Sequence, residues 1–346
     1  MKRMKKSTGR KFNLSPVILT IIILISLTGW SCIDNSIAPQ HKLPNVNTGL
    51  TRSDTTALDF FVLSDWGFSG SDTQRSVASE MGRVSKLVGL NFILTCGDNF
   101  QTAGVDSVND PLWFDNYENV YNDSSLQVPW HPALGNHDYM GNPDAQVDYS
   151  INSKTWKMPA RYYSFVEKAN TRNAVRFIVL DTQGLIQDYQ NLTDTTAYDS
   201  IPQYHWLKHL LSGVKEQWII VTGHHPVFSA SNHHGDTYEM KKLIKPLFDQ
   251  YLVDFYICGH DHHFEHATAT GKKTDYIVTG TGGSPRPEDK NERTVYSMSA
   301  PGFTYISIKK DRADLYFITV DDLIGYSYTK FAGLHSRERI NHLLQN

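Results

Sequence analysis

Short clusters of aspartate, asparagine and histidine recur along this sequence, each after an apolar stretch of strand length. The clusters are Asp65, Gly97-Asp98-Asn99, Gly135-Asn136-His137-Asp138, Gly223-His224-His225 and Gly259-His260-Asp261-His262. Carboxylate and amide oxygens together with imidazole nitrogens are ligands for metal ions, and a preceding glycine lets the chain turn sharply beside an ion. Two ions ~3.5–4 Å apart clamp a phosphoryl group and generate hydroxide between them. The clusters therefore predict a binuclear centre that hydrolyses phosphate esters.

Each cluster by itself is weak evidence for a metal site. A glycine and an aspartate after a strand often form an ordinary turn, a Gly-Asn-His-Asp run can cap a helix, and histidines at a strand end can form a polar rim. The clusters gain weight together because each directly follows an apolar stretch. Open α/β sheets bind ligands at the carboxyl ends of their strands, so the shared position favours one common site.

The sequence between the clusters alternates between apolar runs of strand length and amphipathic stretches of helix length. The pattern predicts strands at 58–63, 91–95, 128–134, 161–165, 175–180, 218–221, 255–257, 276–278, 303–308 and 313–319. It predicts helices at 74–88, 111–121, 202–211 and 238–251, and a loop that contributes to specificity at 183–200. Alternating strands and helices followed by hairpins imply an α/β sandwich with mixed sheets.

The composition is that of a globular protein with a sizeable core. The chain has 346 residues, of which 40% are hydrophobic and 20% charged, and its net charge is −3. Because the body contains no long basic run, nucleic acid is not expected as a partner. A Walker loop and a Gly-x-Ser-x-Gly elbow are both absent from the sequence, so P-loop and serine-hydrolase chemistry have no support.

The first 31 residues have the pattern of a secretory signal. A basic head precedes an apolar run at 17–27, which is shorter than the ~20 residues of a membrane span. Cys32 follows and predicts lipoprotein processing, although Gly29 and Trp30 fit the preceding positions imperfectly. Alternatively, Cys32 is an ordinary residue just outside a signal-anchor helix. We expect export, either as a lipoprotein anchored through Cys32 in the envelope of a bacterial cell or as a secreted protein.

The predicted organisation is a signal peptide at 1–31, a flexible tether at 32–56, a catalytic domain at 57–330 and a C-terminal tail at 331–346. Two further cysteines, Cys96 and Cys258, lie in apolar strands before ligand clusters. They are expected to be small buried hydrophobes. A disulfide is the alternative in an exported protein.

The motifs resemble the calcineurin-like metallophosphoesterases, and within that superfamily the small, tartrate-resistant type of purple acid phosphatase. The resemblance extends from Leu58 to Thr319 and rests on Ser64-Asp65-Trp66-Gly67, Gly97-Asp98-Asn99-Phe100, Leu134-Gly135-Asn136-His137-Asp138, Gly223-His224-His225-Pro226-Val227-Phe228-Ser229 and Cys258-Gly259-His260-Asp261-His262. It implies a four-layer α/β/β/α sandwich with two mixed β-sheets. The branch of protein serine/threonine phosphatases is disfavoured, because its Gly-Asp-x-x-Asp-Arg-Gly continuation is absent.

The resemblance also implies a role for each cluster. The first metal ion would be bound by Asp65 and His262, and Asp98 would bridge the two ions. The second ion would be bound by Asn136, His224 and His260. His137 would lie beside the substrate phosphate and stabilise its charge or protonate the leaving oxygen. His234 resembles a further histidine on the substrate side, with His233 as its rival, and either is alternatively an exposed loop residue.

One position departs from the purple phosphatases. Their Gly-Asp cluster continues to a tyrosine whose phenolate binds Fe(III) and gives the colour, whereas this sequence has Gln101 there. Other members of the superfamily carry an Asp-x-His first motif, but position 67 is glycine. A neutral amide oxygen of Gln101, or water, would complete the first site. We therefore expect two metal ions drawn from Fe, Mn or Zn, without an Fe(III)-tyrosinate.

The resulting prediction is a metal-dependent phosphatase in which a metal-bound hydroxide attacks a phosphomonoester in line. The substrate would be a phosphorylated small molecule or a phosphoprotein. A phosphodiesterase or a pyrophosphatase on the same metal core is the alternative within the hydrolases. The alternative outside the enzymes is a surface binding protein without turnover. In such a protein, Gln101 would be the first change that removes a ligand from the catalytic metal site.

Overall fold

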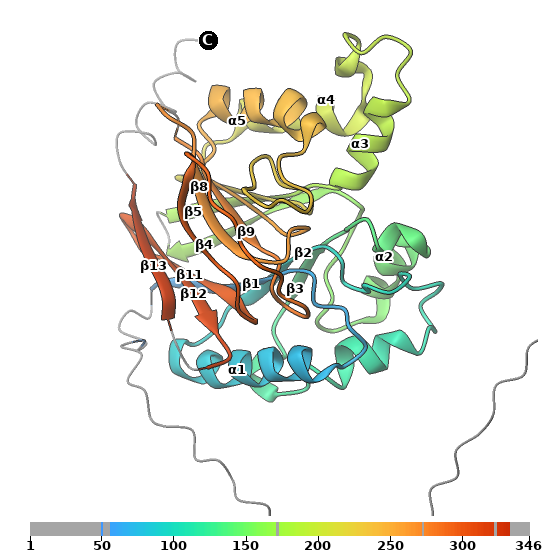
Figure 1. Ribbon diagram of the computed structural model, residues 1–346, viewed down its shortest axis with the longest axis vertical. Helices are drawn as coiled ribbons and strands as arrows, with labels where there is room; N and C mark the ends of the chain where they lie inside the picture. The colour runs from blue at the N-terminus through green and yellow to red at the C-terminus, as the bar shows by residue number, and fades with distance from the viewer. Residues whose placement is uncertain (1–49, 51–55, 171–172, 272, 322–323, 333–346) are drawn as a thin grey trace, which may run out of the picture. The chain divides into compact units, whose positions relative to one another are not determined.

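The computed structural model describes residue 50 and residues 56–170, 173–271, 273–321 and 324–332. Within these residues two β-sheets pack face to face, and helices cover the outer face of each sheet (Figure 1). The predicted α/β/β/α sandwich is confirmed. The predicted signal peptide at 1–31, with Cys32, lies outside the described residues, as do most of the predicted tether and tail.

Both sheets mix parallel and antiparallel strands. The six-stranded sheet has the order β13-β12-β11-β1-β2-β3, with β1 (Leu58–Leu63), β2 (Phe92–Cys96), β3 (Trp130–Ala133), β11 (Gly302–Ile308), β12 (Arg312–Thr319) and β13 (Ile324–Phe331). The seven-stranded sheet has the order β10-β8-β9-β7-β6-β5-β4, with β4 (Tyr163–Asn170), β5 (Asn173–Val179), β6 (Trp218–Thr222), β7 (Phe255–Cys258), β8 (Phe264–Thr268), β9 (Asp275–Thr279) and β10 (Thr294–Met298). Strands β1, β2 and β3 are parallel, as are β5, β6, β7 and β9. Their carboxyl ends therefore supply the loops of one edge in each sheet.

Alternate residues of the central strands enter different apolar layers. In β1, Phe60 faces the core between the sheets, whereas Phe61 faces the layer under helix α1. Phe60 stacks on Phe92 with ring centroids 4.9 Å apart and meets the ring of Phe177 edge-on at 5.3 Å. Because successive side chains of a strand point to opposite faces, a slip of one residue would exchange the two layers. The apolar pattern thus fixes the register, and with it the loop positions.

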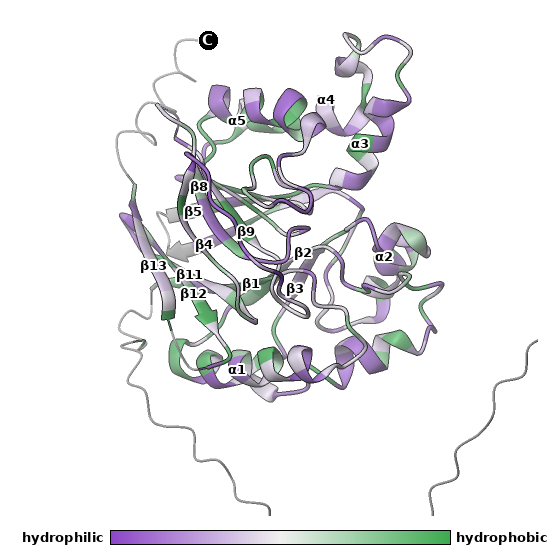
Figure 2. Ribbon diagram, in the orientation of Figure 1, coloured by the Kyte–Doolittle hydropathy of each residue, from purple (hydrophilic) through white to green (hydrophobic). Residues whose placement is uncertain are grey.

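Helices bury one side against each sheet. Helix α1 (Asp72–Val88) covers the six-stranded sheet, while α3 (Thr182–Gln190), α4 (Pro202–Gly213) and α5 (Lys245–Tyr251) cover the other (Figure 1). Figure 2 shows apolar residues interspersed with polar residues along α1, as expected for a helix with one buried face. Ser71 caps the start of α1 by accepting a hydrogen bond from the N–H of Gln74, and Gly89 ends it in a left-handed conformation.

Two predicted helices differ in the structure. The segment predicted as a helix at 111–121 contains only a short π-helix, Trp113–Glu118. The helix predicted at 238–251 is divided into a π-helix, Met240–Ile244, and α5. The division lies beside Pro246, which has no N–H to continue the α-helical ladder. The N–H of Lys245 bonds instead to the carbonyl of Met240, five residues earlier.

Several elements have no counterpart in the prediction. Helix α3 occupies part of the predicted loop at 183–200, and helix α2 (Pro143–Asn152), β8, β10 and β13 were not predicted at all. Helix α3 begins because the Asp181 carboxylate accepts a hydrogen bond from the N–H of Gly184. Strand β8 carries buried Glu265 and His266, which interrupt the apolar run by which a strand is found.

The two cysteines of the catalytic body are buried and free. Burial raises the pKa of Cys96 to about 12, so this thiol is inert rather than reactive. The expectation of small buried residues is confirmed, and the disulfide alternative is not realised. Among the described helices, none combines the length and apolar character needed to cross a membrane.

Candidate metal centre

The loops after five parallel strands bring the sequence clusters together. Asp65 follows β1, Asp98 follows β2, and Asn136 and His137 follow β3 in one sheet. The other sheet contributes His224 after β6, and His260 and His262 after β7. The candidate site therefore lies where the carboxyl-end loops of both sheets converge.

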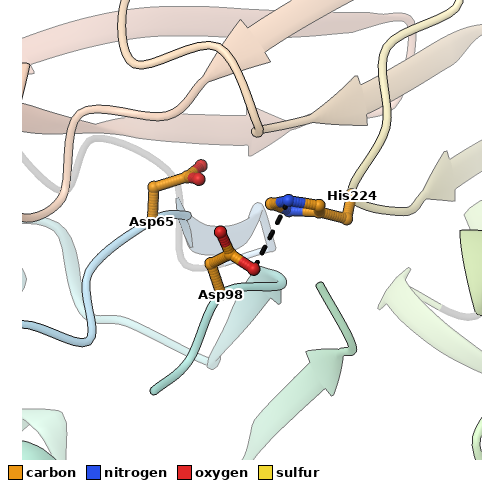
Figure 3. A group of neighbouring side chains, drawn as sticks. All are labelled: Asp65, Asp98 and His224. Carbon is orange, nitrogen blue, oxygen red and sulfur yellow. Dashed lines mark ion pairs between the residues drawn. The ribbon is translucent and has the colours of Figure 1, made fainter. Parts of the chain in front are cut away.

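Two carboxylates and an imidazole form its centre (Figure 3). One possible ligand atom from each of Asp65, Asp98 and His224 lies within 4.8 Å of the other two, and all three residues are buried. The Asp98 Oδ1 and His224 Nε2 atoms are 3.5 Å apart. The backbone φ angles of Asp65 and Asp98 are 53° and 49°. Such left-handed conformations are unfavourable for residues with a Cβ and are typical of functional sites.

A second group of donors converges on His224. Its Nε2 atom lies 2.9 Å from Oδ1 of Asn136 and 3.2 Å from Nδ1 of His260. Its Nδ1 atom lies 2.9 Å from the carbonyl oxygen of Cys96. A hydrogen bond from Nδ1 to this carbonyl leaves the Nε2 lone pair directed at the site, as in metal-binding histidines. Asn136, His224 and His260 thus offer three donor atoms around one point beside Asp98.

The other side of the centre contains Asp65 and His262. Oδ1 of Asp65 lies 3.3 Å from Nε2 of His262, while Nδ1 of His262 lies 2.7 Å from the carbonyl oxygen of Ser284. Oδ2 of Asp65 accepts a hydrogen bond from the N–H of His260. Oδ1 of Asp65 and Oε1 of Gln101 are buried without a hydrogen-bond partner. Because buried polar atoms are almost always paired, the Asp65 oxygen fits a site that receives a cation. The unpaired Gln101 oxygen belongs to the loop that carries Asp98.

The electrostatics of the protein alone disfavour the charged forms of Asp98 and His260. Burial raises the pKa of Asp98 to about 7; the charge of His224 opposes this rise, and the carboxylate of Asp65 adds to it. Burial also lowers the pKa of His260 far below its usual range, and nearby His224 contributes. A bound cation would favour both the ionised carboxylate and the neutral imidazole. The donor set therefore matches metal binding.

Two glycines allow this close packing. A Cβ on Gly135 would lie 2.1 Å from Oδ1 of Asp98, and one on Gly259 would lie 2.2 Å from Oδ2 of Asp65. Neither position has room for a methyl group. The glycines before the ligands are thus required by the close approach of neighbouring loops.

The two predicted substrate-side histidines lie beside the donor cluster. The N–H of His137 donates to Oδ1 of Asp98 at 2.9 Å, and its side chain is 32% exposed. The ring of His234 stacks on the ring of His260 with centroids 4.0 Å apart. His233 contacts the ring of His234 at 4.2 Å between centroids, and both histidines are exposed, as the loop alternative expects. Of the two rivals, His234 is the one that touches a member of the cluster.

Sequence reasoning gave no role to several residues that support the ligands. The Asp138 carboxylate accepts hydrogen bonds from the backbone N–H groups of Gly135, Asn99 and Phe100 and from the side chain of Gln146. It therefore joins the loop after β3 to the loop after β2. Asp138 belongs to the recognised motif Gly135-Asn136-His137-Asp138. The motif alone does not reveal that its aspartate binds backbone N–H groups.

A hydroxyl after β5 supports the loop after β6. Oγ1 of Thr182 accepts hydrogen bonds from the N–H groups of His224 and His225, and it lies 2.8 Å from Nδ1 of His225. Burial lowers the pKa of His225 well below its usual range, which favours the neutral form of this ring. Thr182 was not found because a single aspartate, Asp181, follows the predicted strand at 175–180, without the glycine, asparagine or histidine of the other clusters.

A sixth loop, Gly280–Arg286 after β9, also lines the centre. The N–H of Gly282 donates to the carbonyl of Ser64, and the N–H of Arg286 donates to the carbonyl of His262 at 2.7 Å. A Cβ on Gly280 would lie 2.9 Å from Oδ2 of Asp65. The signal for this loop was present in the sequence, since a Gly-rich run follows a predicted strand.

Comparison with known proteins agrees with this geometry. Residues 58–264 match the model of the calcineurin-like phosphoesterases. The chain belongs to that family. It is 33% identical to tartrate-resistant acid phosphatase type 5 of Homo sapiens over 80% of this chain and 90% of the relative. It is 31% identical to purple acid phosphatase 7 of Arabidopsis thaliana, over 81% and 88%.

Two solved structures share the fold of this phosphoesterase. GAP50, the anchor in the inner membrane complex of Plasmodium, superposes with a TM-score of 0.71 at 25% identity, over 83% of this chain and 95% of its own. Purple acid phosphatase PPD1 from yellow lupin superposes with a TM-score of 0.59 at 15% identity, over 79% and 53%. With acid phosphatases as relatives and a candidate metal site in place, the chain is a metal-dependent phosphoester hydrolase with a binuclear centre.

The support that Asp138 gives to the loops leads to a prediction. Asp138→Asn places an amide NH₂ where backbone N–H groups need an acceptor. An unpaired buried donor costs about 1–3 kcal/mol, so we expect a comparable loss in the free energy of unfolding, measured in urea. The control is Asp148→Asn, an exposed residue of α2, which should change stability by less than about 0.5 kcal/mol. Equal stability of both variants would contradict the role of Asp138.

Proposed function

We propose that this protein hydrolyses phosphomonoesters at two metal ions held by six side chains. The proposal is supported by one observation above all, the convergence of the donor atoms from five separate loops at one point between the sheets. The ligands are Asp65, Asp98, Asn136, His224, His260 and His262. When bound, the two ions neutralise the phosphoryl oxygens and acidify the attacking water.

The residues divide between the two ions by their contacts. Asp65 and His262 would hold the first ion, because their side chains face each other at 3.3 Å. Asn136, His224 and His260 would hold the second, and Asp98 would lie between the two ions. The Oε1 atom of Gln101 is buried without a partner, and we assign it to the first ion as an additional, neutral ligand beside these six.

The two substrate-side histidines would act on the phosphate and its leaving group. His137 is fixed through its backbone N–H to Asp98 while its ring is partly exposed. Its ring would donate a hydrogen bond to a phosphoryl oxygen or protonate the leaving oxygen. His234, stacked on His260, would bind the phosphate from the opposite side of the opening.

Two other functions use the same scaffold. A diesterase or pyrophosphatase would need only a different opening around the same ligands. A binding protein without turnover draws support from GAP50, an anchor whose structure superposes on this chain. The complete ligand set favours catalysis, because a binding protein has no need to keep two buried carboxylates among histidines.

Substitution of the bridging ligand tests catalysis. Asp98→Ala removes the carboxylate assigned to both ions, and we expect hydrolysis of 4-nitrophenyl phosphate to fall by at least ~100-fold, with less bound metal. The measurement is kcat/KM together with metal analysis of the purified proteins. Asp148→Ala, on the exposed side of α2, should retain wild-type values.

The outcome distinguishes the three functions. Equal turnover by wild type and Asp98→Ala would refute the catalytic proposal. Turnover of bis(4-nitrophenyl) phosphate alone would favour a diesterase. Binding of metal without turnover of either compound would favour the anchor-like function.

A second prediction concerns metal identity. We propose two ions drawn from Fe, Mn or Zn, without a tyrosinate ligand, because a neutral amide at Gln101 stabilises Fe(III) less than a phenolate does. The purified protein should therefore lack a strong visible charge-transfer band. Gln101→Tyr introduces a phenol at the position that we assign to the first ion and, after loading with iron, should produce such a band. A coloured wild-type protein would contradict the assignment, and Gln101→Phe serves as the colourless control.

We also propose that the protein is exported and anchored through a lipid on Cys32. This proposal rests on the basic head and the apolar run at 17–27 in the sequence. Cys32→Ser should release the activity from the membrane fraction after expression in a bacterial host. Metabolic labelling with a fatty acid should mark the wild type and not the variant, and an unlabelled, secreted wild type would refute lipidation. The substrate would then be a phosphorylated small molecule or phosphoprotein outside the cytoplasm.

A further inference from the structure

Arg286 lies in the loop after β9, next to His262 of the candidate metal centre. Its backbone N–H donates to the carbonyl of His262, an assigned ligand, at 2.7 Å. Two residues earlier, the carbonyl of Ser284 lies 2.7 Å from Nδ1 of the same histidine. Arg286 is thus tied to the metal centre by the backbone that orients His262.

The guanidinium group lacks a counter-charge. Within the described ranges Arg286 forms no ion pair, and its Nη1 atom is buried without a hydrogen-bond partner. By contrast, Arg293, the next arginine along the chain, is paired with Asp236 at 3.0 Å. Arg286 as a whole is only partly buried, but its Nη1 atom is a buried cationic donor without a partner, which is unfavourable. This atom therefore suits an anion that the protein itself does not supply.

The charge of Arg286 acts on both sides of the opening. Burial lowers the pKa of His234; the Asp261 carboxylate opposes this, and the charges of His233 and Arg286 lower it further. Burial also lowers the pKa of His262, Asp65 raises it above its usual value, and Arg286 opposes that rise. The charge of Arg286 is thus close enough to affect both His262 and His234, and its backbone contacts His262 directly.

We propose that Arg286 binds a second anionic group of the substrate, adjacent to the scissile phosphate. This inference rests on the proposed phosphatase function. The scissile phosphate already has two ions and two histidines to meet its charge. A planar guanidinium matches the paired oxygens of a phosphate or a carboxylate. The favoured substrates are then phosphoanhydrides, or phosphomonoesters that carry a phosphate or carboxylate close to the scissile group.

Three compounds distinguish binding of a second anionic group by Arg286 from a general effect of Arg286 on catalysis. Inorganic pyrophosphate carries a second phosphate, 2-phosphoglycolate carries a carboxylate, and 4-nitrophenyl phosphate carries no anionic group besides the scissile phosphate. A hydrogen bond to a charged group contributes about 1.5–3 kcal/mol, which corresponds to roughly 10–100-fold in kcat/KM. Arg286→Gln should lower kcat/KM by this factor for the first two compounds and by less than about threefold for the third.

Two further variants sharpen the test. Arg286→Lys keeps the charge but loses the fork of donors, so it should recover part of the loss. Arg83→Gln is the matched control, because Arg83 pairs with Glu80 on α1, away from the loops of the centre. It should leave all three compounds unaffected. Thermal melting of each variant checks that the proteins are folded.

The results separate this inference from the proposed function. An equal loss for all three compounds, or no loss for any, would overturn the role of Arg286. A wild type that hydrolyses none of them would refute the phosphatase proposal instead. In that case calorimetric titration of the metal-loaded proteins with pyrophosphate and with phosphate decides the question. Preferential binding of pyrophosphate that disappears in Arg286→Gln supports the inference, and equal binding overturns it.

Discussion

Two carboxylates buried next to each other are the constraint on which the rest of this structure depends. Asp65 and Asp98 are both almost inaccessible to water, and both have left-handed backbone conformations. Repulsion between the two carboxylates and the strain of their backbone conformations both destabilise the folded protein unless other interactions compensate for them. Histidines from the facing sheet provide part of it, and a cation would provide the remainder. The sandwich brings these partners together because its two sets of parallel strands end at the same place.

The polar contacts around the centre maintain this arrangement. Asp138 joins the loops after β2 and β3, and Thr182 holds the loop after β6. The loops that carry Asp65 and Asp98 are in turn joined to each other, since the N–H of Asp65 donates to the carbonyl of Gly97 and the N–H of Gly67 to the carbonyl of Asp98. Each ligand is thus fixed through a hydrogen bond to another loop. This rigidity explains why glycine is required where those loops touch.

Much of the fold and the ligand set could be predicted from sequence, for a physical reason. Strand β1 was predicted with its observed bounds because its two faces meet two apolar layers. All its residues are therefore apolar except Asp59, which accepts a hydrogen bond from the hydroxyl of Tyr305. The donor clusters were visible because their positions after strands follow from the topology. The π-helical turns at 113–118 and 240–244 and the helix α3 were not predictable in this way. Their backbone paths depend on Pro246, on the cap at Asp181 and on contacts with distant residues.

The charge balance of the centre connects Gln101 with Arg286. The proposed ligand set contains two carboxylates, and its remaining donors are neutral. Two divalent ions therefore leave an excess of positive charge, which a phenolate at position 101 would have reduced. Arg286, unpaired among the described residues, adds to that excess at the opening. Both features support our proposal that the centre discriminates in favour of strongly anionic substrates. A positive site of this kind attracts anions over a distance of about one Debye length, ~8 Å at physiological ionic strength, so the rim as well as the ions contributes to the selection of substrate.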